Sequence, residues 1–533
     1  MQAPCWKCGA SPTNAPGLPE SEAMLSSLEL DSATYLLHSN DAPLASEIPG
    51  VRHIVSAERN RIERLQTEIL ELQKALERRM QELEETKASL KNHTAILSAV
   101  RRVPAEIICE IFSYTLPCTR RVNGLDTQQA PWRLGHICRQ WRATVLGYPP
   151  LWSSIAVHAS WDDDTYSLAM VETHLRRSAN ASLAVTLDCK DGQIKSSNFS
   201  KSIDLILRHS THWVTLSLRL HHLVAARILA RLRPAMGRLP ALRTLEFVEV
   251  TKQYRTPDSS LTGDTFSIAP ALQKVFLTRE PFHNVALTAD LQLSWSQLTH
   301  FRGTWRFQED GLNILRSTPN VVECGITIVG RDSLPPGSTH VALPNLRRLS
   351  IDAHGGFLEL LRAPLLQELW ITGDTAHYYL RPFIQHSSCT LVKLVMDDCS
   401  DPPWLAMILP DIPTLTTLYI AFSDKAIAKV LFDALKITGG PSDILPNLTH
   451  LAAGGSSGFG INAFVNMAAT RWYKGTPRLS FMRTFYRLDV SSSSSAFKDV
   501  VSLIEKMRGE GLDAGFDTGF RPEPRNYFGL GCP

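Results

Sequence analysis

The pentapeptide GGSSG at residues 454–458 matches a motif for covalent catalysis. It fits the G-x-S-x-G pattern, in which a serine, here Ser456, attacks from a sharp turn between a strand and a helix. Such a serine needs a histidine base, which follows the serine in enzymes that use this turn. No histidine follows His450. We therefore interpret the pentapeptide as a loop after a strand, where glycine permits a positive φ. We predict that the chain is not an enzyme.

Two further groups of residues have the types that bind metals or transfer protons. Cys5 and Cys8 form a C-x-x-C pair, which is one half of a zinc site, but no second pair follows at a usable spacing. We interpret them as free cysteines in a flexible tail, with a metal shared between two chains as the alternative. The carboxylates of Asp162–Asp164 and of Asp397 with Asp398 are interpreted as polar loops rather than acid–base pairs. No cofactor is expected.

Composition narrows the class of protein further. The 533 residues have a formal net charge of +3, which favours neither a nucleic-acid-binding domain nor an acidic tail. The most apolar long stretch, residues 404–422, is interrupted by Pro410, Asp411 and Pro413, so no membrane span is expected. Ten scattered cysteines and the lack of a recognisable signal peptide indicate reduced thiols. The expected location is the cytoplasm, the nucleus or both.

Residues 51–95 form a charged segment without proline or glycine, which predicts a long helix. One apolar column recurs every seven residues: Val55, Ile62, Ile69, Leu76, Leu83, Leu90 and Leu97. The companion column three residues later is apolar only at Leu65 and Leu72 and is otherwise polar: Glu58, Arg79, Thr86 and His93. A coiled coil needs both columns. The pattern leaves open a weak homodimer through residues 51–97 or packing on another surface of the same chain.

A short helical unit is predicted at residues 96–155. Pro104 suits the first turn of a helix, and the residues after it place four apolar side chains on one stripe: Ile107, Ile108, Ile111 and Phe112. A second helical stripe contains Leu134, Ile137, Cys138, Trp141 and Val145. About 55 residues without a disulfide make a marginal domain that usually needs a partner.

The rest of the chain contains an internal repeat. Phrases such as LPNLRRLSI and APLLQELWI recur, and their first apolar anchors are Leu242, Leu272, Leu298, Val321, Leu346, Leu366, Leu391, Leu415 and Leu448. The spacing, 20 to 33 residues, and the L-x-x-L core are typical of leucine-rich repeats. Each unit is expected to supply one short strand and a return segment that is often helical, so that stacked units share one core.

The helical unit resembles an F-box. The resemblance lies in VPAEIICEIF from Val103, HICRQW from His136, and Leu151 with Trp152. Val103 and Ile137 depart from the usual Leu and Val, and the loop 118–129 is longer than typical. The order of charged helix, F-box and leucine-rich repeats also resembles a large group of fungal F-box proteins.

The resemblance implies an α/β leucine-rich-repeat solenoid preceded by a small all-α F-box domain and a long charged helix. The expected boundaries are a disordered segment at 1–50, the helix at 51–95, the F-box at 96–155, the solenoid at 156–520 and a tail at 521–533.

It also implies a substrate-recruiting subunit of an SCF-type ubiquitin ligase, whose F-box binds the Skp adaptor and the cullin-based ligase core. Matched residue by residue, the adaptor-binding candidates are Val103, Pro104, Ile107, Ile108, Ile111, Phe112, Leu134, Ile137, Cys138 and Trp141. Candidate contacts to a protein substrate are the repeat aromatics Trp305, Trp370 and Tyr419, with Tyr378 and Tyr379. The alternative is a scaffold that binds partners through its repeats and self-associates through its charged helix.

Overall fold

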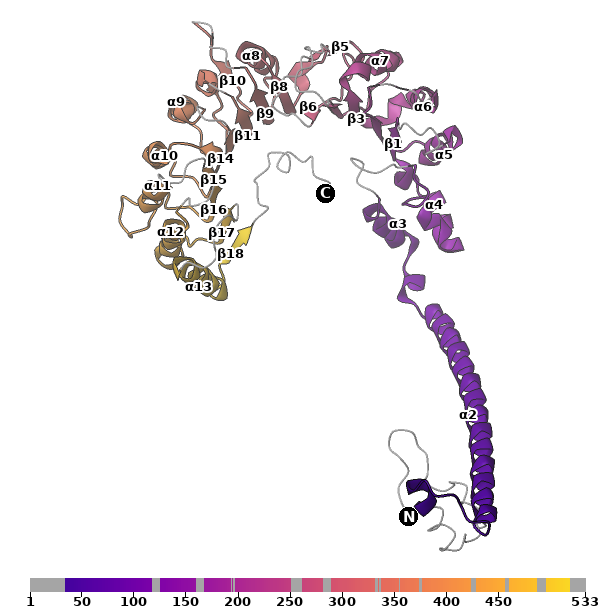
Figure 1. The fold of residues 1–533 in the computed structure, drawn as a ribbon. Helices are drawn as coiled ribbons and strands as arrows, with labels where there is room; N and C mark the ends of the chain where they lie inside the picture. Colours follow the sequence, from indigo (N-terminus) through magenta and orange to yellow (C-terminus); the bar gives the residue numbers. More distant parts are fainter. Residues whose placement is uncertain are drawn as a thin grey trace. The chain divides into compact units, whose positions relative to one another are not determined.

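The computed structural model (Figure 1) describes residues 34–116, 125–159, 167–192, 194, 197–250, 261–280, 289–330, 334, 337–353, 355–372, 376–422, 428–455, 460–486 and 495–517. These residues belong to two compact units, Met1–Pro104 and Ala105–Pro533. The C-x-x-C pair, the Asp162–Asp164 run, Ser456 and the tail from residue 521 lie outside the described residues.

The first unit contains the predicted long helix. Helix α2 spans Ile48–Ile96, with a proline in its first turn, and is followed by the 3-10 turn η1 (Ala99–Arg102). The helix predicted at 51–95 is therefore confirmed. None of its 49 residues is buried, so its apolar columns lie exposed.

The second unit begins with short helices. They are α3 (Ala105–Tyr114), η2 (Arg133–His136), α4 (Arg139–Gly147) and η3 (Pro149–Trp152). Helix α4 begins at a capping interaction, in which the backbone N–H of Trp141 donates to the Cys138 sulfur at 3.4 Å. The buried indole of Trp152 donates to the Val145 carbonyl at 2.9 Å, which ties η3 to α4.

A single parallel sheet of fourteen strands follows, in the order β1-β2-β3-β4-β6-β8-β9-β11-β13-β14-β15-β16-β17-β18. The strands are β1 (Ser154–His158), β2 (Leu183–Cys189), β3 (Trp213–His221), β4 (Thr244–Val250), β6 (Lys274–Glu280), β8 (His300–Trp305), β9 (Glu323–Ile328), β11 (Arg348–Asp352), β13 (Glu368–Thr372), β14 (Lys393–Cys399), β15 (Thr417–Phe422), β16 (His450–Gly455), β17 (Phe481–Tyr486) and β18 (Asp513–Asp517). Two small sheets pair β5 (Leu261–Gly263) with β7 (Ala289–Leu291) and β10 (Val341–Ala342) with β12 (Leu361–Arg362).

Helices cover one face of the sheet, so the strands line the inner side of the repeat array and the helices its outer side (Figure 1). These helices are α5 (Leu168–Ser178), α6 (Ser197–Leu207), α7 (His222–Leu232), α8 (Gln308–Ser317), α9 (Leu380–Ser387), α10 (Pro402–Ile408), α11 (Ala428–Ala434), α12 (Ile461–Lys474) and α13 (Ser495–Gly509). Further 3-10 turns are η4 (Ser210–His212), η5 (Arg233–Ala235), η6 (Trp295–Gln297), η7 (Gly355–Leu360), η8 (Ala376–Tyr379) and η9 (Leu409–Asp411).

The nine repeat anchors have the same structural role throughout. Each is at most 1% exposed, and each lies two residues before the first residue of a strand. The residue between anchor and strand donates its backbone N–H to the preceding unit, as Gln273 does to Arg243 and Thr299 to Gln273, both at 2.9 Å. Within a strand, successive side chains point to opposite faces of the sheet, and Leu349 and Ile351 enter the helix-covered core. The predicted α/β solenoid-like array is thus confirmed.

The array extends further at both ends than the anchors indicate. Strand β1 (Ser154–His158) contains the boundary predicted between residues 155 and 156. Strand β18 (Asp513–Asp517) follows α13 and lies beyond the last anchor, Leu448. Trp152, fully buried, lies two residues before β1 and so holds the anchor position of the first strand.

An aromatic cluster joins the short helices to the first repeat. The Trp132 and Trp152 rings meet edge to face at 5.0 Å, and Trp152 meets His174 of α5 at 5.2 Å. The Arg177 guanidinium lies 4.5 Å from the Trp152 ring centroid, within cation–π range. Because Nε2 of His174 lies 3.0 Å from the carbonyl oxygen of Ser154, the neutral ring carries its proton on Nε2 and donates it there.

This cluster predicts a loss of stability in mild acid. Burial lowers the pKa of His174 from 6.5 to about 4. Between pH 6.5 and about pH 4 the unfolded state binds a proton that the folded state does not. The free energy of unfolding therefore has its full value above pH 6.5 and decreases as the pH falls. We expect a loss of about 2 kcal/mol near pH 5. Urea unfolding measured above pH 6.5 and near pH 5 checks this. The variant His174→Gln should lack the part of the pH dependence that His174 contributes. An unchanged pH dependence in the variant would contradict the assignment.

Candidate functional site

The apolar stripe of α3 divides into an inner and an outer pair. Ile108 and Phe112 are 2% and 1% exposed, whereas Ile107 and Ile111 are 52% and 51% exposed. Each pair is spaced by four residues and so occupies one side of the helix. The inner pair belongs to the core, and the outer pair leaves apolar surface in solvent.

The remaining adaptor-binding candidates divide in the same way. Ile137 and Cys138 are exposed, and Leu134 is half-buried. Trp141 is half-buried because its ring packs edge to face on Phe112, with centroids 4.8 Å apart. Val103 and Pro104 precede α3 and belong to the other compact unit; Val103 is half-buried and Pro104 exposed. The large apolar candidates that stay exposed are therefore Ile107, Ile111 and Ile137.

The strand face of the sheet, opposite the helix-covered core, carries an apolar cluster of its own. Trp370, Val395, Tyr419 and Ala452 occupy the same register position on β13, β14, β15 and β16 and pack together. Trp370 and Tyr419 are 4% and 7% exposed, so they contribute mainly edges to the surface.

The other aromatic candidates lie elsewhere. Trp305 packs on Phe301, with centroids 5.2 Å apart, against the main core on the other face of the sheet. Tyr379 also packs against that core, while Tyr378 is exposed and meets Trp404 edge to face at 5.5 Å. The structure thus brings Trp370 and Tyr419 together and places Trp305 apart from them.

A row of charged residues crosses the strand face beside this cluster. Neighbouring strands begin with Glu323, Arg348, Glu368 and Lys393, which stand opposite one another in register. Glu323 pairs with Arg348 and, at 3.3 Å, with His300. Lys393 Nζ lies 4.0 Å from Glu368 and 5.5 Å from the Tyr419 ring centroid.

Partial burial affects the charges of this row. Burial favours a raised pKa at Glu323, but the hydrogen bond and charge of His300 and the charge of Arg348 outweigh it, so the pKa is lowered and the carboxylate stays ionised. Burial lowers the pKa of Lys393, and the charge of Glu368 opposes that effect. The row therefore keeps alternating charges in a partly dehydrated position, where they act more strongly than in water.

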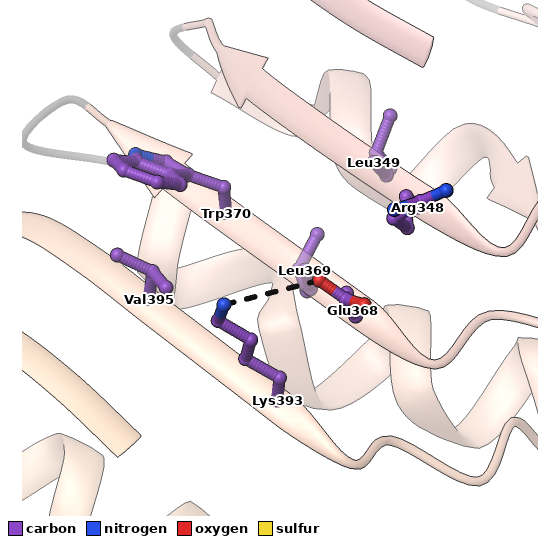
Figure 2. A pocket seen from close by; sticks show the side chains of 7 residues that line it. All are labelled: Arg348, Leu349, Glu368, Leu369, Trp370, Lys393 and Val395. Carbon is purple, nitrogen blue, oxygen red and sulfur yellow. Dashed lines mark ion pairs between the residues drawn. The ribbon is translucent and has the colours of Figure 1, made fainter. Parts of the chain in front are cut away.

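A small pocket opens where the charged row meets the apolar cluster (Figure 2). Its lining is Arg348, Leu349, Glu368, Leu369, Trp370, Lys393 and Val395. In Figure 2 the indole of Trp370 and the side chain of Val395 lie along the strands beyond Glu368 and Lys393. Such a lining offers ion pairing and apolar contact, which are the interactions by which proteins recognise other proteins.

The charged row is not among the residues predicted from the sequence, although the sequence contains the signal for it. The residue two places after each anchor is charged or histidine in most repeats, and that position faces away from the core. Reading that one position along the repeats would have revealed the row.

The fold and these two surfaces define a parallel α/β solenoid-like protein whose strand face carries an apolar cluster and a row of charged residues. No family model matches the chain, and no curated protein matches it significantly. Among the described residues, no cluster of three or more His, Cys, Asp or Glu side chains is placed to hold a metal ion. The described helices include none with the length and apolar character needed to span a bilayer.

Proposed function

We propose that the chain is the substrate-recruiting subunit of an SCF-type ubiquitin ligase. The short helices bind the Skp adaptor, and the repeat array, as leucine-rich repeats, binds a protein substrate. The observation that supports this best is the division of the α3 stripe: Ile108 and Phe112 fill the core while Ile107 and Ile111 stay exposed. An exposed apolar surface beside a packed core is what a protein-binding helix requires.

In this proposal the chain acts by proximity rather than by catalysis. The short helices pack into the repeat array through Trp132, Trp152 and His174. A substrate on the strand face is therefore held at high local concentration relative to the ligase core, which favours transfer of ubiquitin to its lysines.

Co-purification tests the proposal directly. We expect the purified full-length chain to bind the Skp adaptor, and the adaptor to bridge it to the cullin. Failure of the full-length chain to bind would leave the alternative function, a scaffold that uses its repeats to bind partners outside a ligase.

The charged row predicts where a substrate binds. Lys393→Glu places a second carboxylate beside Glu368, and we expect substrates captured by the full-length chain to be lost or weakened about tenfold. Lys429→Glu, on helix α11 of the outer side, is the matched control. Quantitative comparison of the proteins captured by each variant provides the measurement. Equal capture by both variants would place the substrate site elsewhere.

A further inference from the structure

The apolar stripe of α2 changes its companion column partway along the helix. In the first part, the seven-residue column is joined by residues three places later, Leu65 and Leu72. After Leu76 the companion lies four places later, at Met80. The resulting α2 stripe consists of Ile62, Leu65, Ile69, Leu72, Leu76, Met80 and Leu83, all exposed.

The change of companion keeps the stripe on one side of the helix. A column that repeats every seven residues drifts by about 20° per heptad on a straight α-helix. Moving the companion one residue onward compensates for this drift. Arg79 and Thr86, which interrupt a strict heptad, have by then rotated out of the stripe. Arg79 and Thr86 therefore do not interrupt the apolar surface between Ile62 and Leu83.

We propose that α2 binds the α2 helix of a second copy of this chain in a parallel, in-register, two-stranded coiled coil along the α2 stripe. A partner helix with an uninterrupted heptad would fall out of phase after Leu76. A second copy has the same change of companion at the same level, so its stripe matches over the full length.

The charges beside the stripe fit this arrangement. Arg79 and Glu84 lie on opposite sides of the stripe, so that Arg79 of one copy faces Glu84 of the other in a parallel pair. Within one chain Arg79 pairs with Glu82 at 2.6 Å and Glu84 with Lys87 at 2.8 Å. The contacts between copies extend these two ion pairs into one network.

Sedimentation equilibrium of the full-length chain tests the proposal. We expect twice the chain mass of 59.3 kDa. Ile69→Asp should reduce the mass to that of one chain, whereas Leu70→Asp, at an exposed leucine outside the stripe, should leave the dimer intact. A wild-type monomer, or equal loss in both variants, would overturn the proposal. The readout is mass alone, so it is independent of adaptor binding.

Cross-linking tests the parallel, in-register arrangement. Ile69→Cys faces its own counterpart in that arrangement, so mild oxidation should yield a disulfide-linked dimer above the background that the native cysteines give in the wild type, whereas Leu70→Cys should not exceed that background. In an antiparallel pair centred on Leu76, Ile69 faces Leu83 instead. Absence of the cross-link in a dimeric Ile69→Cys chain would therefore overturn the parallel arrangement.

Discussion

Replacing Ile107 and Ile111 together by aspartate is expected to abolish binding of the Skp adaptor and to leave the fold intact. Both side chains are about half exposed, so their loss removes little packing, and surface substitutions usually change stability by less than about 0.5 kcal/mol. An apolar anchor in an interface contributes about 2 kcal/mol, and two of them correspond to about a thousandfold in affinity. Binding of the purified adaptor, measured by calorimetry, and thermal unfolding together test this expectation.

Two controls separate binding from folding. Ile108→Asp places a charge in the core next to Phe112 and should unfold the helical unit. Val430→Asp alters an equally exposed apolar residue on α11 and should affect neither property. Unchanged adaptor affinity in the Ile107 and Ile111 double variant would remove the main observation behind the proposed ligase function.

Arg471→Met is expected to destabilise the repeat array by about 3 to 5 kcal/mol. Arg471 lies on α12 and is 1% exposed. Its guanidinium donates to three backbone carbonyls, those of Leu435 and Leu445 at 2.8 Å and of Ile444 at 2.6 Å. These carbonyls belong to the segment between α11 and β16. Methionine fills a similar volume without donors, and each buried carbonyl left without a partner costs about 1 to 3 kcal/mol.

Urea unfolding of the full-length chain measures this effect. Arg508→Met, at an exposed position of α13, is the matched control and should unfold with the wild type. Because each repeat contacts mainly its neighbours, the loss should be concentrated in the repeats around α12, as hydrogen exchange can show. Identical unfolding curves for Arg471→Met and the wild type would contradict the role assigned to the guanidinium.

The repeat strands were predictable because one local rule governs them. The leucine or valine anchor is buried in each of the nine units predicted from it, and the strand follows after a fixed interval, whatever the length of the return segment. Strand β18 escaped prediction because it lacks this apolar phrase. Strand β1 escaped because its anchor position holds Trp152, a residue assigned to the helical unit.

The candidate sites were predictable only in part. A helical stripe shows that Ile108, Ile111 and Phe112 lie near one another, but which of them is covered depends on distant residues such as Trp141, which packs on Phe112. For the aromatic candidates, the number of residues from the anchor already indicates which face of the sheet each side chain occupies. Trp370 lies an even number of residues after its anchor and faces away from the core, whereas Trp305 lies an odd number after its own and faces the core.

The position of Trp152 has a consequence for selectivity. The same indole donates to the carbonyl of Val145 in α4 and lies two residues before the first strand, so no flexible linker separates the helical unit from the repeats. A ligase subunit built in this way would present its cargo in one orientation. The lysines that receive ubiquitin would then be those on the side of the bound substrate that faces the enzyme. The orientation of the substrate, as well as its affinity, would determine the modification sites.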